Sequence, residues 1–526
     1  MIVDFSVKGR ATKHNGLMLA MAMCARQEVD ATTKRSCYEN LHLVCRTPTQ
    51  LFMFISYCEA VSTGHGWSRA HRRAIANWYF HFGQSPEEAK RLAVLVTKYK
   101  SRNGWSHRDV LRLAHPKPNP NVNDNGVAAI LKYIQRGFDK AKEDLKSNEA
   151  ILQYLQAIED VKTQTNPDTL DFAAFAHVIR EHHLKREHVS TRLLNSPHIW
   201  EALLDHMPMT AMIRSLDKMS TIGMLTSGSD HERTITSRLG DIVALKNAKI
   251  HPFTILEALF TYRRGKGDRG RLTWSPNEAI VKALDDAFYL TFSLTEPTNK
   301  RYLVAVDVSS SMFRGSVIGC SSITAGTAAA ALALVTARTE RHCEIVAFSH
   351  DIIPIAVGAH MSLSDVEAAM RDIPVGEADC SMPMQYARKS NKQVDVFVVV
   401  TDSETASQNI SPVEALRLYR RHSGISDAKL VVCAMAGSCF TVADPDDPNM
   451  LDMVGFDSIG PEVIRRFVDG EMNAETQASN EPQTATDTEY VIVTADGTEA
   501  DDRDAANAVE ATNGPQASSR CDRDGE

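Results

Sequence analysis

The chain has 526 residues, of which 43% are hydrophobic and 24% are charged. This length and composition predict a folded protein of two or three domains and exclude a wholly disordered chain. No apolar run approaches the ~18 residues that a membrane span needs, and the first residues lack the pattern of a secretion signal, so we expect neither a membrane protein nor a secreted one.

The net charge of −8 is unevenly distributed along the chain. Residues 471–526 contain 14 acidic and three basic residues, whereas the residues before them contain 52 acidic and 55 basic ones. A slightly basic body with an acidic tail permits a nucleic-acid partner without requiring one. The tail is also poor in aromatic residues and cannot bury enough surface to fold, so we predict that it is disordered.

The ten cysteines show no CxxC pair, and most lie inside apolar periodic segments. The lack of a CxxC pair and the apolar settings argue against zinc sites and disulfides. We therefore predict buried, reduced thiols and a cytoplasmic location.

Residues 1–299 show one helical pattern after another, with apolar residues at 3.6-residue spacing. Helix starts are plainly marked: Ser85 precedes Pro86 and two glutamates, and Ser106 begins a second capping box with Asp109. Roughly a dozen short helices without convincing strands predict an α-solenoid of stacked helix pairs.

Residues 300–470 alternate between strand and helix patterns. All-apolar runs at residues 303–306, 343–348, 394–400 and 430–435 have the character of buried parallel strands. Helical patterns occupy residues 324–340, 364–371, 412–421 and 461–467. The alternation predicts a doubly wound α/β domain with a parallel sheet that is covered on both faces.

Oxygen-bearing side chains follow two of these strands. Asp307, Ser309 and Ser311 come directly after the first strand, and Asp402 follows the third. Both groups are expected at the carboxyl edge of one sheet, where open α/β folds bind ligands. Two carboxylates and two hydroxyls form an oxygen-only set suited to Mg²⁺. The alternative is that Asp307 caps the following helix while the serines bond the loop backbone.

Residues 89–118 contain eight lysines and arginines and one acid. Lys98 and Arg102 are four residues apart, which places both at the end of one predicted helix, and the next helix carries a basic stripe at i, i+4 and i+7. Clustered cations beside aromatic side chains can bind RNA phosphates and stack on unpaired bases. The alternative is an ordinary solvated helix face. The candidate residues are Lys98, Lys100, Arg102, Arg108, Arg112 and His115.

Three other segments are weaker candidates. Residues 265–270 spell GxGxxG but follow a helix instead of a strand, so a flexible basic loop is favoured over a dinucleotide site, and both RNA contact and an ordinary exposed connection remain open for it. Residues 64–73 join a glycine turn to a basic helix start, for which RNA contact and a solvated face both remain open. The histidines between residues 182 and 188 lack metal-ligand spacing and are expected on a surface helix.

The oxygen cluster resembles the metal-ion-dependent adhesion site of von Willebrand A domains, in which a DxSxS motif, a Thr from a later loop and a further Asp surround the metal. The resemblance implies a divalent cation, with Mg²⁺ expected. Ala378 stands where the family has its Thr, which implies weaker binding unless Asp379, Ser381 or water takes its place. The implied ligands are Asp307, Ser309, Ser311 and Asp402.

Several longer motifs resemble the TROVE module of the Ro autoantigen family. They are VTKYK (96–100), NGWSH (103–107), LRLAHPKP (111–118), KIHPF (249–253) and ADPDD (443–447). The resemblance implies a ring of HEAT-like helical repeats closed by a von Willebrand A domain. It also implies binding of small Y RNAs on the outer surface and of single-stranded 3′ ends of misfolded RNAs in a central hole. The family's RNA-contacting residues fall here on Lys98, Arg102 and His115.

These observations predict an RNA-binding ribonucleoprotein core without a reaction of its own. We expect a monomeric scaffold in RNA quality control, with a ribonuclease bridged by RNA as a candidate partner. The runner-up is a protein-binding adaptor that works through the metal site of the A domain. A metal-dependent phosphatase or nuclease is a third alternative, although the sequence contains no GxSxG, P-loop or CxxC motif.

Overall fold

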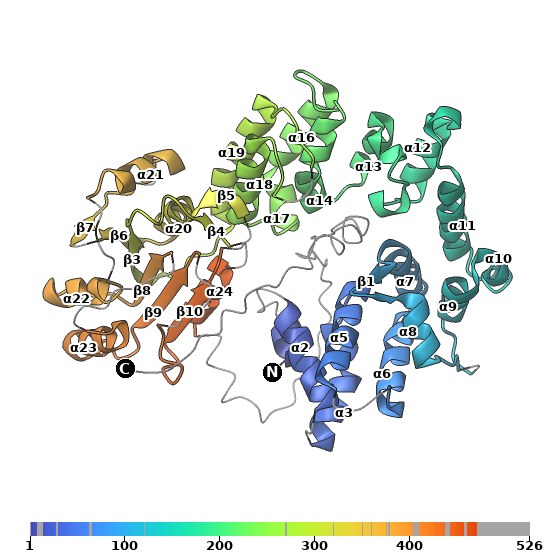
Figure 1. Ribbon diagram of the computed structural model, residues 1–526, viewed down its shortest axis with the longest axis horizontal. Helices are drawn as coiled ribbons and strands as arrows, with labels where there is room; N and C mark the ends of the chain where they lie inside the picture. The colour runs from blue at the N-terminus through green and yellow to red at the C-terminus, as the bar shows by residue number, and fades with distance from the viewer. Residues whose placement is uncertain are drawn as a thin grey trace, which may run out of the picture. The chain divides into compact units, whose positions relative to one another are not determined.

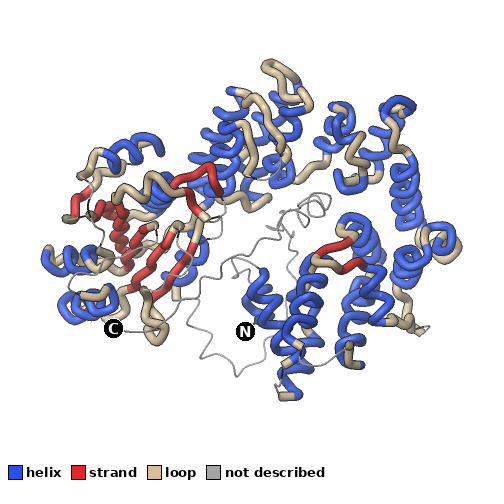
Figure 2. Tube along the Cα trace, viewed as in Figure 1, coloured by secondary structure: helices blue, strands red, loops and turns tan. Residues whose placement is uncertain are grey.

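The computed structural model shows a helical first region followed by a domain built around a six-stranded sheet (Figure 1). Figure 2 shows the same division, with the helices in blue and the strands in red. The structure describes residues 2–7, 14–27, 30–62, 66–119, 121–268, 271–318, 320–349, 351–358, 360–374, 376, 379–402, 410–436, 442–456 and 460–470. The predicted acidic tail, residues 471–526, and Ala378 lie outside the described residues.

The predicted helical character of the first region is confirmed. Its α-helices are α1 (Ile2–Val7), α2 (His14–Arg26), α3 (Ala31–Glu39), α4 (Leu41–Val44), α5 (Pro48–Val61), α6 (Arg69–Phe80), α7 (Pro86–Lys98), α8 (His107–Ala114), α9 (Val127–Arg136), α10 (Phe138–Ala141), α11 (Glu149–Thr163), α12 (Phe172–Glu181), α13 (Pro197–Asp205), α14 (Met209–Arg214), α15 (Leu216–Thr221), α16 (Asp230–Leu239), α17 (Ile242–Asn247), α18 (Pro252–Arg264) and α19 (Glu278–Leu290). Short 3₁₀ helices join them at η1 (His81–Gln84), η2 (Pro167–Thr169), η3 (Arg186–His188), η4 (Leu193–Asn195) and η5 (Thr291–Leu294).

The helices begin where local capping chemistry places them. The Ser85 hydroxyl accepts from the Glu88 amide at 3.2 Å at the start of α7. At the start of α8, the Ser106 hydroxyl accepts from the Asp109 amide at 3.3 Å while the Asp109 carboxylate accepts from the Ser106 amide at 3.2 Å. These bonds satisfy backbone N–H groups that have no partner within the helix. Both predicted helix starts are confirmed.

Helices that are near in the chain pack on one another, as α2 does on α5, α12 on α13 and α18 on α19. One short hairpin interrupts the helices, where no strand is predicted. It consists of β1 (Ser101–Arg102) and β2 (Trp105–Ser106). Because it lies between α7 and α8, it changes the placement of predicted site residues, as described below.

The second region contains a mixed sheet with strand order β10-β9-β8-β3-β6-β7. All neighbouring pairs are parallel except β6 and β7, so the prediction of a parallel sheet is wrong at this edge. β7 follows β6 after a turn too short for a crossover, and such a connection gives an antiparallel pair. The strands are β3 (Arg301–Asp307), β4 (Ser316–Val317), β5 (Cys320–Thr324), β6 (His342–Phe348), β7 (Ile352–Pro354), β8 (Val396–Thr401), β9 (Lys429–Ala434) and β10 (Met450–Val454), with β4 and β5 paired separately.

Helices cover both faces of this sheet, as the doubly wound pattern predicts. Alternate residues of β3 point to opposite faces: Val304 and Val306 join one core, and Leu303 and Ala305 join the other. The helices are α20 (Ala325–Thr339), α21 (Leu363–Arg371), α22 (Met382–Lys389), α23 (Pro412–Ser423) and α24 (Gly460–Val468). The first two and α24 contribute to the first core, and α22 and α23 contribute to the second.

The first core is continuous with the core of the helical region. Buried side chains of α18 and α19 belong to the same cluster as those of α20. The ring of Phe253, on α18, stacks on Phe456 at 4.4 Å between centroids. The Arg338 guanidinium of α20 lies 4.9 Å from the ring centroid of Tyr289 on α19. The last helices of the first region and the α/β domain therefore share buried surface.

The described part of the chain contains eight free cysteines, most of them buried. Burial raises the pKa of thiols such as Cys37, to about 12, because the thiolate loses its hydration. Among the described helices, none is both long and apolar enough to cross a membrane.

Candidate nucleic-acid interface and metal site

The hairpin between α7 and α8 carries part of the predicted RNA-binding surface. α7 ends at Lys98, and a two-residue turn at Asn103 and Gly104 joins β1 to β2 before α8 begins at His107. Both turn residues have positive φ angles, 51° and 76°, which an Asn-Gly pair adopts readily in tight hairpins. Arg102 therefore lies on β1, and the prediction that it shares a helix end with Lys98 is wrong.

A buried histidine fixes the base of the hairpin. His107 Nδ1 lies 2.8 Å from the Tyr79 hydroxyl, and its Nε2 lies 3.0 Å from the Tyr99 carbonyl oxygen. Burial lowers the pKa of His107 to about 3, so the ring is neutral. A carbonyl only accepts, so Nε2–H donates to Tyr99 and Nδ1 accepts from the tyrosine O–H. The end of α7 is thereby tied to the start of α8.

Three predicted basic residues follow one another along the end of α7 and β1. Lys98 and Arg102 are half-buried, and Lys100 is exposed. The Lys98 ammonium lies 4.7 Å from the ring centroid of Tyr99, within cation–π distance. Trp105, on β2, is half-buried beside them.

The other three predicted residues lie on α8 and are exposed. Arg108 Nη2 donates to the Gln135 carbonyl at 3.0 Å, and Arg112 Nη2 lies 3.7 Å from Asp109 Oδ1. His115 caps the C-terminus of the helix with a φ angle of 47°. The predicted stripe is thus present at the surface, and the RNA contacts of all six residues stay a prediction.

Two further lysines join this surface, and no local sequence pattern singles them out. Lys100 is exposed over much of its length, but burial of its ammonium lowers its pKa, and the charge of Lys162 on α11 lowers it further. Burial also lowers the pKa of Lys185, which precedes η3, and the charge of Lys98 lowers it further. Burial and the charges of all four lysines keep the pKa of His188 at about 3. We call Lys98, Lys100, Lys162 and Lys185 the lysine cluster.

The lysine cluster arises from tertiary packing. α7 contacts α11 and η3, and α11 contacts η3. Lys162 and Lys185 lie far from Lys98 along the chain, so a window of neighbouring residues cannot show the cluster.

The glycine-rich loop after α18 is held against the α/β domain. Arg264 donates to the Ser321 hydroxyl at 2.6 Å and to Asp268 Oδ1 at 2.6 Å. The Ser321 amide donates to Asp268 Oδ2 at 3.2 Å. Residues 269 and 270 lie outside the described residues, and the flexibility of the loop stays a prediction. RNA contact there stays a prediction.

The remaining candidate residues differ in their exposure to solvent. Arg72 and Arg73 are exposed on α6, while residues 63–65 of the preceding turn lie outside the described part. His188 is buried in η3, so the prediction of a surface helix is wrong for it. Among the described residues, no three His, Cys, Asp or Glu side chains form a metal-binding group.

The predicted oxygen cluster lies at the carboxyl edge of the sheet. β3 and β8 are parallel neighbours, so Asp307, the last residue of β3, and Asp402, directly after β8, lie at adjacent strand ends. Asp307 Oδ1 accepts from the Ser309 amide at 2.7 Å, and Oδ2 accepts from the Thr401 hydroxyl at 2.8 Å. The hydroxyls of Ser309 and Ser311 are 3.0 Å apart. Burial raises the pKa of Asp307, and the charge of Asp402 adds to the rise.

This donor set fits a hard divalent cation, because a buried carboxylate close to a second one costs less when a cation neutralises both. The bonds that Asp307 receives from Ser309 and Thr401 equally fit its alternative role in ordering the loop. Asp379 accepts from the Ser381 amide at 2.8 Å. The pKa of the buried Cys380 thiol is raised by burial and by several nearby carboxylates, Asp379 among them. Metal occupancy stays a prediction.

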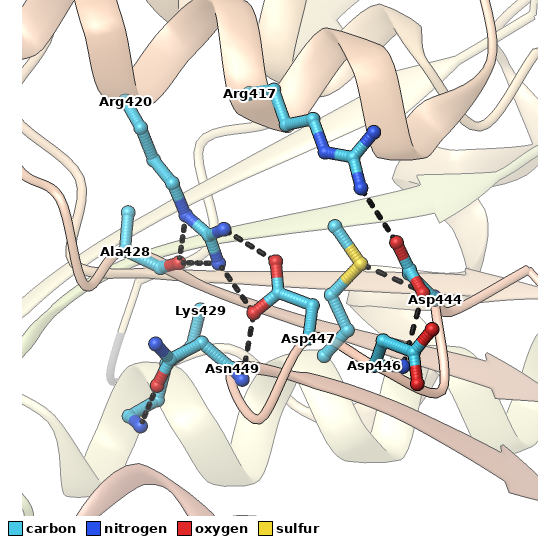
Figure 3. Close-up of polar contacts among 9 residues, drawn as sticks. Arg417, Arg420, Ala428, Lys429, Asp444, Asp446, Asp447 and Asn449 are labelled. Carbon is cyan, nitrogen blue, oxygen red and sulfur yellow. Dashed lines mark hydrogen bonds and ion pairs between the residues drawn. The ribbon is translucent and has the colours of Figure 1, made fainter.

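The ADPDD motif forms an ion-pair network instead of a ligand site (Figure 3). Arg420 on α23 donates to the Ala428 carbonyl at 3.0 and 2.7 Å and also pairs with Asp447. Arg417, one turn earlier, pairs with Asp444 at 2.6 Å. Burial alone would raise the pKa of Asp447, but the Arg420 guanidinium holds it below its ordinary value. The motif therefore fixes the connection between β9 and β10.

Comparisons with known proteins cover most of the chain. The TROVE domain model matches residues 1–259, and the Ro60 vWA domain model matches residues 301–468. RNA-binding protein RO60 of Caenorhabditis elegans is 34% identical over 89% of this chain and 80% of its own length. RNA-binding protein RO60 of Deinococcus radiodurans is 34% identical over 88% of this chain and 83% of its own length.

A solved structure agrees with these matches. The crystal structure of the Deinococcus radiodurans RO (RSR) protein superposes with a TM-score of 0.77 at 32% identity, covering 89% of this chain and 90% of that one. The two domain models occur in the same order as the helical region and the α/β domain described above. The chain therefore belongs to the RO60 family, with a TROVE domain followed by a Ro60-type von Willebrand A domain.

Proposed function

We propose that this protein binds RNA through the hairpin and α8, as the core of a ribonucleoprotein particle. The observation that carries the proposal is the set of six basic side chains between the end of α7 and the C-terminus of α8, none of them buried, beside Tyr99 and Trp105. The relatives are named RNA-binding proteins, which supports the same function.

The expected ligand is a small structured RNA of the Y-like class, together with single-stranded ends of misfolded RNAs. Lysine and arginine bind backbone phosphates and release counterions, so affinity falls as salt rises. Such contacts position the RNA, whereas bases are read where they are unpaired and can stack on aromatic rings. Sequencing the RNA that co-purifies with the protein identifies the ligand.

We infer that the helical region and the A domain form the closed ring that the family resemblance implies, with no catalytic activity. The shared core of α18, α19 and α20 supports a rigid junction on one side of such a ring. A cytoplasmic monomer that meets a ribonuclease through the bound RNA completes the proposal. An RNA-dependent association with a nuclease in pull-downs tests this last part.

The RNA site is tested with Lys98→Ala and Arg102→Ala in the full chain. Each removes one phosphate contact, so RNA affinity falls for all sequences and the slope of log affinity against log salt decreases by about one unit. Fluorescence anisotropy with a labelled RNA hairpin over a salt series measures both quantities. Wild-type affinity and slope in both variants overturn the placement.

The oxygen cluster at Asp307 favours a second candidate function, a metal-dependent protein-binding adaptor. Mg²⁺ is expected to raise the melting temperature of the wild-type protein but not of Asp307→Asn. The adaptor function further predicts a protein partner that Asp307→Ala loses while RNA affinity is unchanged. Mg²⁺-dependent nuclease or phosphatase turnover that Asp402→Ala abolishes favours the enzymatic alternative instead.

A further inference from the structure

We propose that Lys162 and Lys185 form, with Lys98 and Lys100, a phosphate-binding subsite that extends the RNA surface from the hairpin onto the end of α11 and the start of η3. The inference rests on the proposed RNA-binding function and adds a path for the RNA backbone. Its ligand is the phosphodiester backbone of an RNA strand that already contacts the hairpin.

A buried chain of hydrogen bonds holds the three elements of the subsite together. The Thr97 hydroxyl, next to Lys98, donates to the Ala93 carbonyl at 2.7 Å and lies 3.2 Å from the Tyr154 hydroxyl of α11. The Tyr154 hydroxyl lies 3.5 Å from His188 Nε2. The Lys185 amide donates to His188 Nδ1 at 2.9 Å.

The chemistry of these groups determines which one donates in each hydrogen bond. His188 is neutral, and its Nδ1 accepts from Lys185, so Nε2 carries the proton and donates to Tyr154. Tyr154 then donates to Thr97, whose own proton goes to the helix backbone. The backbones that carry Lys98 and Lys185 are therefore tied to α11 with one defined geometry.

The four lysines are held close despite their mutual repulsion. Burial is the largest cause that lowers the pKa of Lys100 and of Lys185, and the next is the charge of a neighbouring lysine, Lys162 for Lys100 and Lys98 for Lys185. Two acids, Glu159 and Glu187, act on these lysines. Glu159 is already engaged by Lys162 at 2.6 Å and by the Tyr133 hydroxyl at 2.6 Å, and Glu187 pairs with Arg186 at 3.3 Å. On a solvated helix face, like charges are normally far apart or paired with opposite charges. Like charges that buried contacts keep close together are typical of a site that binds an anion.

The residue type indicates what part of the RNA is bound. A lysine ammonium is a compact point charge, without the planar fork with which arginine recognises a guanine edge. Four lysines therefore suit successive backbone phosphates and carry no sequence information. The subsite is expected to add affinity for any RNA that reaches it from the hairpin.

The test uses Lys162→Gln and Lys185→Gln in the full chain, with a fluorescently labelled RNA hairpin as probe. Each variant is expected to bind about fivefold to tenfold more weakly at moderate salt and to lose about one unit of the salt slope. Lys162→Arg and Lys185→Arg keep the charge and are expected to retain most of the affinity. Thermal unfolding of each variant checks that the fold is intact.

Two further variants serve as controls for this test. Lys146 pairs with Glu143 three residues away, as Lys162 does with Glu159, but it precedes α11 at the opposite end. Lys146→Gln is expected to bind as wild type. Glu159→Gln removes a negative charge beside the subsite and keeps a partner for Tyr133, so it is expected to bind RNA more tightly and with a steeper salt slope.

The outcomes separate this inference from the proposed function. Wild-type binding by Lys162→Gln and Lys185→Gln, together with weakened binding by Lys98→Ala and Arg102→Ala, overturns the subsite and leaves the proposed function standing. Wild-type binding by all four variants overturns both. Weakening in Lys146→Gln equal to that in Lys162→Gln shows that only overall charge acts, and this also overturns the subsite.

Discussion

His115 occupies a backbone position that histidine rarely takes. It ends α8 with a φ angle of 47°, in the left-handed region where helices most often place glycine. The side chain is exposed, so burial does not compensate for the strained backbone. The conformation therefore costs stability at a residue that lies on the proposed RNA surface, where the imidazole is expected to contact RNA.

Replacing His115 by glycine separates these two roles. His115→Gly is expected to leave the free energy of unfolding unchanged or to raise it by up to about 1 kcal/mol, because glycine adopts this φ angle without strain. RNA affinity is expected to fall. Urea unfolding and fluorescence anisotropy measure the two effects.

An exposed asparagine outside the proposed RNA surface provides the control. Asn299 precedes β3 with a φ angle of 58° and is exposed. Asn299→Gly should relieve the same kind of strain while RNA affinity stays at the wild-type value. Equal RNA affinity in His115→Gly and wild type contradicts the assignment of His115.

Sequence reasoning works for residues whose neighbours are local. The basic run that contains Lys98, Arg108 and Arg112 could be found because these residues are near one another in the chain. Lys162 and Lys185 could not be found, because only the packing of α11 and η3 against α7 brings them to the same surface. His107 lay inside a quoted motif, but its role depends on burial beside Tyr79, which the motif does not show.

At the level of elements, the β1–β2 hairpin determines how the basic residues are presented. Gly104 has a φ angle of 76°, and a Cβ atom added there would meet no neighbour, so only the backbone conformation opposes a side chain. Gly104→Ala is expected to cost about 1 kcal/mol of stability and to weaken RNA binding by misplacing Arg102. The salt slope should hardly change, because no charge is lost.

Gly223→Ala is a matched control for the hairpin. Gly223 also has a φ angle of 76° and no neighbour near an added Cβ atom, but it follows α15. A similar loss of stability with wild-type RNA affinity is expected for it. Weakening of RNA binding in both variants, measured by anisotropy over the same salt series, would show that stability alone governs binding.

Elements were predictable where local chemistry decides them. The caps at Ser85 and Ser106 mark helix starts because they satisfy backbone groups within one turn. β10 was missed because Asp452 interrupts its apolar pattern, and its half-buried strand shows no continuous run. The position of Arg102 on a strand does not follow from its spacing from Lys98, because four residues is also one helical turn. The adjacent Asn103 and Gly104 are the local signal of a hairpin turn.

For the whole molecule, buried histidines predict sensitivity to acid. Burial is the main cause that lowers the pKa of His71, His107 and His188 to about 3. In the unfolded chain a histidine has a pKa of about 6.5. Between these two values the unfolded chain binds protons that the folded protein does not, so stability is lost as the pH falls below about 6.5.

The expected loss is about 2 kcal/mol for each of the three histidines between pH 7 and pH 5. Urea unfolding at several pH values in this range measures it. His71→Phe removes one titrating group and should make the pH dependence shallower, since the ring packs among the aromatic side chains Tyr38, Phe54 and Trp67. Unfolding midpoints that do not change between pH 7 and pH 5 contradict the prediction.

The order of the two regions was predictable from the change in hydrophobic period near residue 300, because helices and buried strands have different periods. The antiparallel β7 and the core shared across the two regions were not predictable. Both depend on which surfaces meet, and no spacing within one element records that. The predicted boundaries at residues 299 and 470 stay predictions.

The shared core has a consequence for how such a protein can be divided. Separating the chain near residue 300 would leave Phe253 without Phe456, and Tyr289 without Arg338, so each half would present a newly wetted apolar patch. Halves expressed alone are therefore expected to aggregate, and recombination that exchanged one half for an unrelated module would produce an insoluble product. We therefore expect the two regions to stay soluble only when they are expressed or transplanted together.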